Sequence, residues 1–242
     1  GFTGKAIEDG LAAQGIHTDF IHLPEGNSRI NVKVKHGDET EINGQGPVIT
    51  EEAINELFAK LDTLTKEDIL VLAGSIPNTL PEDIYEKILA SLESKGIRVV
   101  VDATKDLLLN VLKYHPFLIK PNNHELGEMF GTVCKTDEDI VHYAKKLQEK
   151  GAVNVLISMA GDGAILITED GQNIKMGTPK GKVVNSVGAG DSMVAGFITG
   201  YIRGGNYEEA LKSGTAAGSA TAFSEGLASL EMYEKMLKQI TE

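Results

Sequence analysis

Tryptophan is absent from this sequence, and cysteine occurs once, as Cys134. A single cysteine excludes an internal disulfide and a cysteine-rich metal site, a usage typical of a reducing compartment. No apolar run is long enough to cross a bilayer, so we expect a cytoplasmic protein. The formal net charge of −12 disfavours nucleic acid and anionic membranes as partners, because both require a basic face. A small phosphorylated substrate stays open, since it needs only a few local donors.

Proline is also scarce, whereas glycine is abundant. Seven prolines stand against 27 glycines, and 41% of the residues are apolar. This composition suits an enzyme of strands and helices joined by tight turns. A chain of 242 residues can bury the core of one large α/β domain, with or without a small appendage, and one domain over 1–242 is the simpler prediction.

Strand and helix patterns alternate along the chain. Continuous apolar runs predict buried strands, and amphipathic patterns between them predict helices. The predicted strands are 69–73, 98–102, 117–120, 153–158 and 163–168, and the predicted helices are 50–61, 81–95, 123–129 and 137–150. This order indicates the α/β class, with a mostly parallel central sheet and helices on both faces.

Residues 28–35 and 39–43 instead alternate polar with apolar positions around a turn at 36–38. The pattern predicts a hairpin with one wet face. We expect a small β-lid at about 28–47, although an edge hairpin without function fits the pattern equally well. The exposed strand edge would permit pairing with a second copy, so we expect a homodimer through the lid.

The beginning of the chain is unusual for this class. Residues 1–4 lead straight into a helical pattern at 5–14, where an α/β domain normally supplies a strand first. We therefore expect that an amino-terminal part is missing and that the chain is a partial record or a fragment.

The strongest local signal is Asn-Ser-Val-Gly-Ala-Gly-Asp at 185–191, followed by an apolar helical run. Small residues at Gly188, Ala189 and Gly190 allow close backbone approach, and amide N–H groups converge at the start of a helix, where anions bind. A carboxylate at Asp191 would repel phosphate bound in such a cradle, so its presence indicates a chemical task. That task could be to accept a proton from an attacking hydroxyl. The alternative is an acidic residue that stabilises the helix dipole beside packing glycines.

Three further loops carry polar groups after predicted strands, where open α/β sheets bind ligands. Asn122 and Glu125 stand three apart at a helix start and could hold a hydrated Mg²⁺, while capping by Asn122 and a solvated Glu125 is the alternative. The loop 158–163 could lie against a nucleotide or be a plain hairpin turn. The loop 73–77 offers the Ser75 hydroxyl.

In order and spacing, these loops resemble the PfkB (ribokinase-like) carbohydrate kinases, closest to the branch of 1-phosphofructokinase and tagatose-6-phosphate kinase. The resemblance covers essentially the whole chain. Asn185 replaces the Asp usual at the first position of the glycine-rich motif. Asn-Ser-Val there, followed by Asp-Ser-Met-Val-Ala-Gly-Phe, is typical of the fructose-1-phosphate kinases.

The resemblance implies roles for individual residues. Asp191 would be the catalytic base, and the amides of Gly188, Ala189 and Gly190 would form the anion hole. Lys120, Asn122 and Glu125 would organise ATP and Mg²⁺. Ser158, Gly161 and Gly163 would lie along the nucleotide, and Thr215 and Ser219 belong to the helix expected beside adenine. Arg29 and Ser75 would contact the sugar phosphate, with 45–47 closing the lid, although Arg29 could simply be solvated. Asn185, Val187, Ser224 and Gly226 are candidates for a monovalent cation such as K⁺.

The family's Asn-Pro-x-x-Asp and Gly-Gly-Lys-Gly-x-Asn segments, which read the sugar, do not occur here. The resemblance implies phosphorylation of a ketose phosphate by ATP, first of all fructose 1-phosphate. Tagatose 6-phosphate and fructose 6-phosphate are alternative acceptors, and a non-catalytic binder of sugar phosphate or nucleotide is the alternative of another class. A nicotinamide-dependent oxidoreductase fits poorly, because no Gly-x-Gly-x-x-Gly run follows a strand.

Overall fold

The computed structural model describes residues 1–36 and 38–241. Its internal contacts divide the chain into two compact units, which we describe separately. The first unit comprises Gly1–Asp68 and Ser75–Ile97, and we name it the lid unit after the lid predicted at about 28–47. The sheet unit comprises Ile69–Gly74 and Arg98–Glu242. Within the described residues, no helix is both long and apolar enough to cross a membrane.

The lid unit contains one hairpin and several helices. Strands β1 (Asn31–His36) and β2 (Asp38–Asn43) pair antiparallel, with Val32 opposite Ile42 and Lys33 opposite Glu41. The predicted hairpin is therefore confirmed, while Gly37 of its turn lies outside the described residues. The helices are α1 (Phe2–Ala12), α2 (Glu51–Asp62) and α3 (Ile84–Leu92), and α3 continues into a 3-10 turn at Glu93–Lys95.

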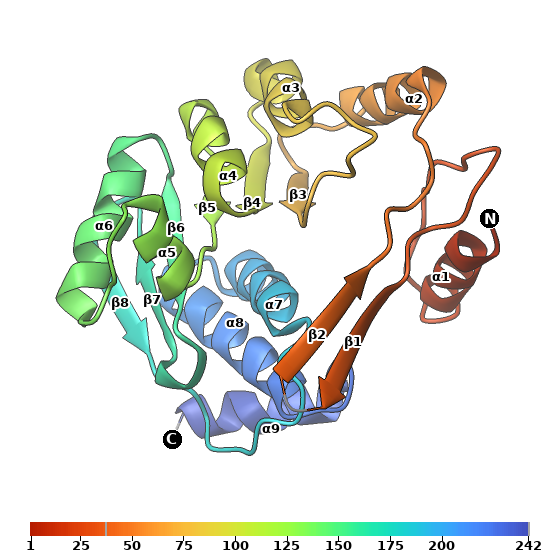
Figure 1. The fold of residues 1–242 in the computed structure, drawn as a ribbon. Coiled ribbons are helices and arrows are strands. Elements are labelled where there is room, and N and C mark those ends of the chain that lie inside the picture. Colours follow the sequence, from red (N-terminus) through yellow and green to blue (C-terminus); the bar gives the residue numbers. More distant parts are fainter. Residues whose placement is uncertain (37, 242) are drawn as a thin grey trace. The chain divides into compact units, whose positions relative to one another are not determined.

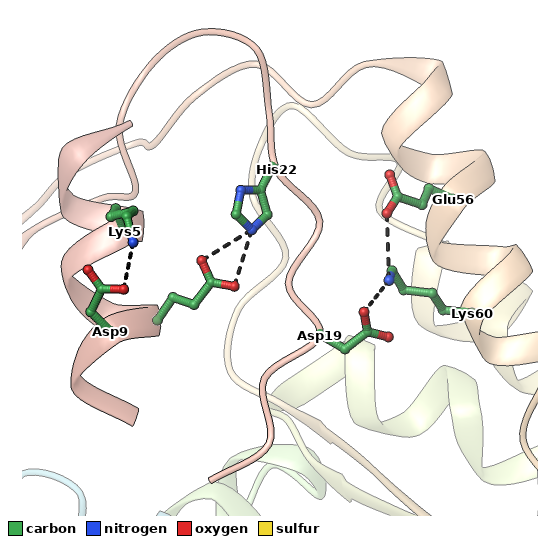
Figure 2. A network of polar contacts seen from close by, with 7 residues as sticks. Lys5, Asp9, Asp19, His22, Glu56 and Lys60 are labelled. Carbon is green, nitrogen blue, oxygen red and sulfur yellow. Dashed lines mark hydrogen bonds and ion pairs between the residues drawn. The ribbon is translucent and has the colours of Figure 1, made fainter. Parts of the chain in front are cut away.

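Exposed ion pairs connect the elements of the lid unit (Figure 2). Lys60 of α2 lies 2.5 Å from Asp19 and 3.6 Å from Glu56, and His22 lies 3.2 Å from Glu8 of α1. None of the residues of α1 is buried. Exposed pairs contribute little to stability because water screens them, so α1 and the segment that follows it are joined by weak contacts.

The sheet unit is built on six strands in the order β3-β4-β5-β6-β7-β8 (Figure 1). These strands are Ile69–Ala73, Arg98–Asp102, Leu118–Ile119, Asn154–Ser158, Ala164–Ile167 and Asn173–Met176. Pairing is parallel from β3 to β6 and antiparallel from β6 to β8. The sheet is thus mostly parallel as predicted, and the loop after β6 joins two antiparallel strands.

Helices cover both faces of this sheet. They are α4 (Lys105–Val111), α5 (Asn123–Met129), α6 (Asp137–Glu149), α7 (Ala189–Gly204), α8 (Tyr207–Ala222) and α9 (Leu230–Thr241), with 3-10 turns at Leu112–Tyr114 and Ala160–Asp162. Leu156 and Leu166 stand opposite each other and pack in one core with Phe197 of α7. Since side chains alternate along a strand, the neighbouring Ile157 and Ile165 point to the other face. There α6 contacts β6 and β7.

Helices α7 and α8 pack closely because glycines line their contact. A Cβ atom on Gly196 would lie 2.6 Å from the carbonyl oxygen of Ser213, and one on Gly214 would lie 2.9 Å from that of Met193. The Ser213 hydroxyl donates to the Gly196 carbonyl over 2.7 Å and lies 2.9 Å from the Tyr233 hydroxyl of α9. These contacts fix the axis of α7, whose first turn carries the glycine-rich motif.

Candidate active site

Polar groups gather at the carboxyl ends of the parallel strands in the sheet unit. Asp102 ends β4, Lys120 follows β5, and Ser158 ends β6. Asn122 forms an isolated parallel bridge with Ser158, which brings the loops after β5 and β6 side by side. The loops after β5 and β6 therefore lie at the same edge of the sheet.

Lys120 is a buried cation at this edge. Its side chain is 8% exposed, and its Nζ lies 3.3 Å from the Asp102 carboxylate, which is 19% exposed. Burial raises the pKa of Asp102, the attraction of Lys120 opposes that shift, and the nearby charges of Asp191 and Glu125 add to it. These four charged side chains are therefore electrostatic neighbours, as the predicted site requires.

Asp102 had not been predicted as a site residue. Its position in the sequence could have indicated it, because Asp102 is a charged residue at the end of an apolar strand. Lys120 likewise follows the apolar strand that ends at Ile119. What the sequence does not show is that β4 and β5 are neighbours, which places the two side chains together.

The glycine-rich motif forms the start of α7. Gly188 is its N-cap residue with φ 80°, a backbone conformation that favours glycine. A Cβ atom on Gly190 would lie 3.1 Å from the Lys120 Nζ, so the ammonium group lies against the backbone of this turn. Asp191 follows in the first turn, and its side chain is exposed. The structure therefore brings Asp191, Gly190 and Lys120 together.

The predicted anion-hole donors differ in their hydrogen bonds. The Ala189 N–H donates to the Ser186 carbonyl over 3.2 Å, so this amide already has a partner. Gly190 and Asp191 occupy the second and third helical positions, whose N–H groups find no carbonyl within their own helix. The anion-hole role of this turn stays a prediction, best carried by the Gly190 and Asp191 amides.

Asn122 and Glu125 form a capping box at the start of α5. The Asn122 Oδ1 accepts from the N–H groups of His124 and Glu125 over 2.9 and 2.8 Å. The Glu125 carboxylate accepts from the Asn122 N–H over 2.8 Å. The capping alternative for Asn122 is thus what the structure shows, whereas Glu125 is half-buried and bonded instead of solvated. Their part in holding Mg²⁺ stays a prediction.

The predicted nucleotide-binding residues differ in exposure, from exposed Gly161 to fully buried Thr215. Ser158 is half-buried and Gly161 is exposed, with its carbonyl accepting from the Thr178 hydroxyl over 2.9 Å. Gly163 is buried, and a Cβ atom there would lie 2.0 Å from the Met176 carbonyl oxygen, so its absence of a side chain serves the packing of β7 against β8. Thr215 and Ser219 are buried within α8, at 0% and 7% exposure.

The candidates for a monovalent cation lie on two segments that the structure brings together. The Asn185 Nδ2 donates to the Glu225 carbonyl over 3.0 Å, and the Val187 N–H donates to the Asn185 Oδ1 over 3.2 Å. The Ser224 hydroxyl, just past the end of α8, donates to the Ala220 carbonyl of that helix. Segments 185–187 and 224–226 are therefore neighbours, while cation binding by their oxygens stays a prediction. Within 1–36 and 38–241, no three His, Cys, Asp or Glu side chains cluster as a metal site would require.

The lid unit joins the two predicted sugar-phosphate residues. The Arg29 guanidinium donates to the Ser75 hydroxyl through both terminal nitrogens, at 3.3 and 3.4 Å. Gly46, with φ 75°, lies beside the Arg29 Cβ. Arg29 is therefore not merely solvated, and it presents its forked donors next to a hydroxyl from 46 residues further along the chain.

Comparison with known proteins gives a consistent result. The family described as pfkB family carbohydrate kinase matches residues 1–232. Among curated relatives, a 1-phosphofructokinase from Bacillus subtilis (strain 168) is 49% identical, over 99% of this chain and 78% of that protein. A D-tagatose-1-phosphate kinase from Bacillus licheniformis is 38% identical, over 99% of this chain and 79% of that protein.

Solved structures agree with these matches. A putative phosphofructokinase from Staphylococcus aureus superposes with a TM-score of 0.89 at 45% identity, covering 99% of this chain and 78% of that one. Phosphofructokinase-2 from Escherichia coli, solved in complex with potassium, gives 0.89 at 25% identity, covering 100% and 80%. With the motif at the start of α7 and the match over 1–232, the chain belongs to the pfkB family of carbohydrate kinases.

Proposed function

We propose that this protein transfers the γ-phosphoryl group of ATP to the free primary hydroxyl of a ketose phosphate, converting fructose 1-phosphate into fructose 1,6-bisphosphate. One observation carries the proposal. An exposed carboxylate, Asp191, stands in the first turn of a helix whose Gly190 leaves room for the buried Lys120 ammonium, 3.1 Å from where a Cβ would stand. A base, N–H donors and a fixed cation are the three parts that phosphoryl transfer needs in one place.

Each part has a separate task in this mechanism. Asp191 accepts the proton of the acceptor hydroxyl as its oxygen attacks the γ-phosphorus in line with the departing ADP oxygen. The N–H groups of Gly190 and Asp191 point toward the transferring phosphoryl oxygens, and the helix dipole favours negative charge there. Lys120 offsets the charge of the phosphates from a site that water reaches poorly.

The donors present fit a magnesium ion that arrives with the nucleotide. Mg²⁺ prefers carboxylate oxygens, phosphates and waters, and it is usually held by one or two protein carboxylates. Glu125 and Asp191 are close enough to act on the pKa of Asp102, so such carboxylates are present. When bound, Mg²⁺ would neutralise phosphate charge. The 185–187 and 224–226 segments remain our candidates for K⁺, supported by the potassium complex of the similar phosphofructokinase-2.

The acceptor follows from the relatives and from the lid unit. Fructose 1-phosphate is favoured because a 49% identical relative is a 1-phosphofructokinase. Tagatose 1-phosphate is a second candidate, since a 38% identical relative is a D-tagatose-1-phosphate kinase. Arg29 and Ser75 are our candidates for holding the acceptor's phosphate, because a guanidinium fork matches phosphate oxygens. Tagatose 6-phosphate and fructose 6-phosphate carry that phosphate at the opposite end of the sugar.

A coupled assay of ADP release tests the proposal. The purified enzyme is given MgATP with fructose 1-phosphate, tagatose 1-phosphate, fructose 6-phosphate or tagatose 6-phosphate in turn. We expect the highest kcat/KM with fructose 1-phosphate. ADP release no faster with any sugar phosphate than without one would leave the non-catalytic binder as the better description.

The proposal also includes the assembly and the location. The lid hairpin exposes Val32, Val34 and Ile42 on one face, at 44%, 44% and 60%. An apolar face of this kind supports pairing of two copies through their lids. A single kinase domain with its lid at about 28–47, working in the cytoplasm where ATP is supplied, completes the proposal.

A further inference from the structure

Asp102 and Lys120 form a charged pair that the mechanism above uses only in part. Both residues stand at the carboxyl ends of neighbouring parallel strands, β4 and β5. The backbone of Asp102 is itself fixed, because its carbonyl accepts from the Gly74 N–H over 3.1 Å at the end of β3. The carboxylate that faces Lys120 is therefore attached to a fixed backbone position.

Stability does not account for this pair. Burial raises the pKa of Asp102 in spite of the attraction from Lys120, and Asp191 and Glu125 raise it further. The charged carboxylate is therefore less favourable in the folded protein than in water at neutral pH. A buried ion pair is weak evidence for stability in general, and perturbed carboxylates gather at functional sites.

The pair does determine where the ammonium group lies. A lysine side chain has four rotatable bonds and loses rotamer freedom when it is fixed. In this structure the Lys120 Nζ lies 3.3 Å from Asp102 on one side, and 3.1 Å from the Cβ position of Gly190 on the other. The carboxylate thus holds the ammonium against the turn at which α7 begins.

We propose that Asp102 is a positioning residue that holds the Lys120 ammonium group against the Gly190 turn before the nucleotide arrives. This inference rests on the proposed function of that turn as the phosphate site. The Lys120 side chain is then already ordered when the phosphates bind. Binding therefore does not have to offset the entropy cost of ordering it, and the affinity is higher. Asp102 acts through Lys120 and touches neither substrate.

Equilibrium binding in a double-mutant cycle tests this inference. Calorimetry measures the affinity for MgATP, without sugar, of the wild type, Asp102→Asn, Lys120→Met and the double variant. Asn keeps the shape of Asp and removes its charge. We expect Asp102→Asn alone to weaken MgATP binding about tenfold, and the double variant to bind as Lys120→Met does. The calorimetric stoichiometry gives the fraction of folded protein, so incomplete folding does not alter the comparison.

Two results would overturn the inference. If Asp102→Asn weakens binding by the same factor in the Lys120→Met background, Asp102 acts independently of Lys120, for instance on the metal. If Asp102→Asn binds MgATP as the wild type does, the pair positions nothing.

A matched control is Asp137→Asn, which removes one carboxylate from an exposed pair with Lys175 (2.6 Å) in the same unit. Its MgATP affinity should equal that of the wild type. The double-mutant cycle also tests the role of Asp102 separately from the proposed function. An enzyme that binds MgATP but phosphorylates no ketose phosphate refutes the function, whereas additive penalties in an active kinase refute only the role of Asp102.

Discussion

Helices α1 and α8 show how differently the two units of this protein are held together. None of the 11 residues of α1 in the lid unit is buried, whereas ten of the 16 residues of α8 in the sheet unit are. Exposed ion pairs such as Lys60 with Asp19 connect elements of the lid unit, whereas close glycine contacts join α7 and α8 in the sheet unit. The predicted catalytic residues Asp191 and Lys120 therefore lie in the unit with closely packed helices, while Arg29 and Ser75 lie in the other unit.

The sharpest test of this division is to remove the carboxylate at the start of α7. We expect Asp191→Asn to lower kcat by about 10³-fold or more, because a general base acts in the transition state. The affinity for ATP should stay within about tenfold, since the base contributes little to ground-state binding. Steady-state kinetics and calorimetry measure the two quantities. Turnover close to the wild-type rate would remove Asp191 from the mechanism.

Adding a methyl group to a glycine in each unit should change stability in opposite directions. Gly196→Ala places a Cβ 2.6 Å from the Ser213 carbonyl oxygen, and we expect it to lower the free energy of unfolding by about 1–3 kcal/mol. Gly10→Ala in α1 meets nothing within 4 Å and should raise it by about 0.5–1 kcal/mol, because alanine favours helix. Urea unfolding of both variants measures the difference. A change of the same sign in both variants would contradict the difference in packing between α1 and α7.

The lid hairpin should matter for assembly more than for the fold of the sheet unit. Ile42→Thr removes apolar surface from the exposed face of the hairpin, and we expect it to weaken self-association at least about tenfold. Analytical ultracentrifugation measures the dissociation constant. Glu41→Gln on the opposite face is the control and should leave it unchanged. Equal dissociation constants for Ile42→Thr and the wild type would argue against a dimer through this face.

The smallest effect that we expect is a pH-dependent change in Tm when the capping box of α6 is altered. The N–H groups of Lys135 and Thr136 lower the pKa of Asp139 in the capping box of α6, while the cap residue of α1 has no side-chain bond. A lowered folded-state pKa gives a contribution that is present above the unfolded value and is lost as the pH falls. The difference in Tm between the wild type and Asp139→Asn should therefore shrink as the pH falls below about 4.

A neighbouring substitution controls this measurement. Glu138→Gln removes a first-turn charge from α6 and leaves both cap hydrogen bonds in place. Its effect on Tm should be smaller than that of Asp139→Asn near neutral pH. If the two variants behave alike at every pH, the cap bonds do not contribute as described.

The sequence predicts elements with a strong local pattern, whether buried like β4 or exposed like the hairpin of β1 and β2. Strands β3 and β4 and helix α5 have the predicted bounds, because complete apolar runs and a capping box mark them. Strand β8 has only four residues and two of them are exposed, so it has no apolar run. Helix α9 was not predicted, although its strongly amphipathic pattern could have revealed it.

The candidate site shows the same limit. Asp191, Lys120 and the glycine turn could be predicted because each stands in a local motif. The position of Asp102 at the end of a strand could be predicted, but its pairing with Lys120 could not, since that depends on which strand lies beside β4. Gly163 was assigned to the nucleotide from its position in a loop, whereas the carbonyl of Met176 behind it explains the residue without any ligand.

The glycine-lined contact between α7 and α8 has one more consequence. Glycines on both helices let the two backbones approach closely, and this close fit fixes the position of α7 along its own axis. Sliding α7 by a single residue would drive side chains such as Phe197 into the carbonyls of its neighbour. The position of the turn that carries Asp191 is thus set by close contacts at Gly196 and Gly200, further along the same helix.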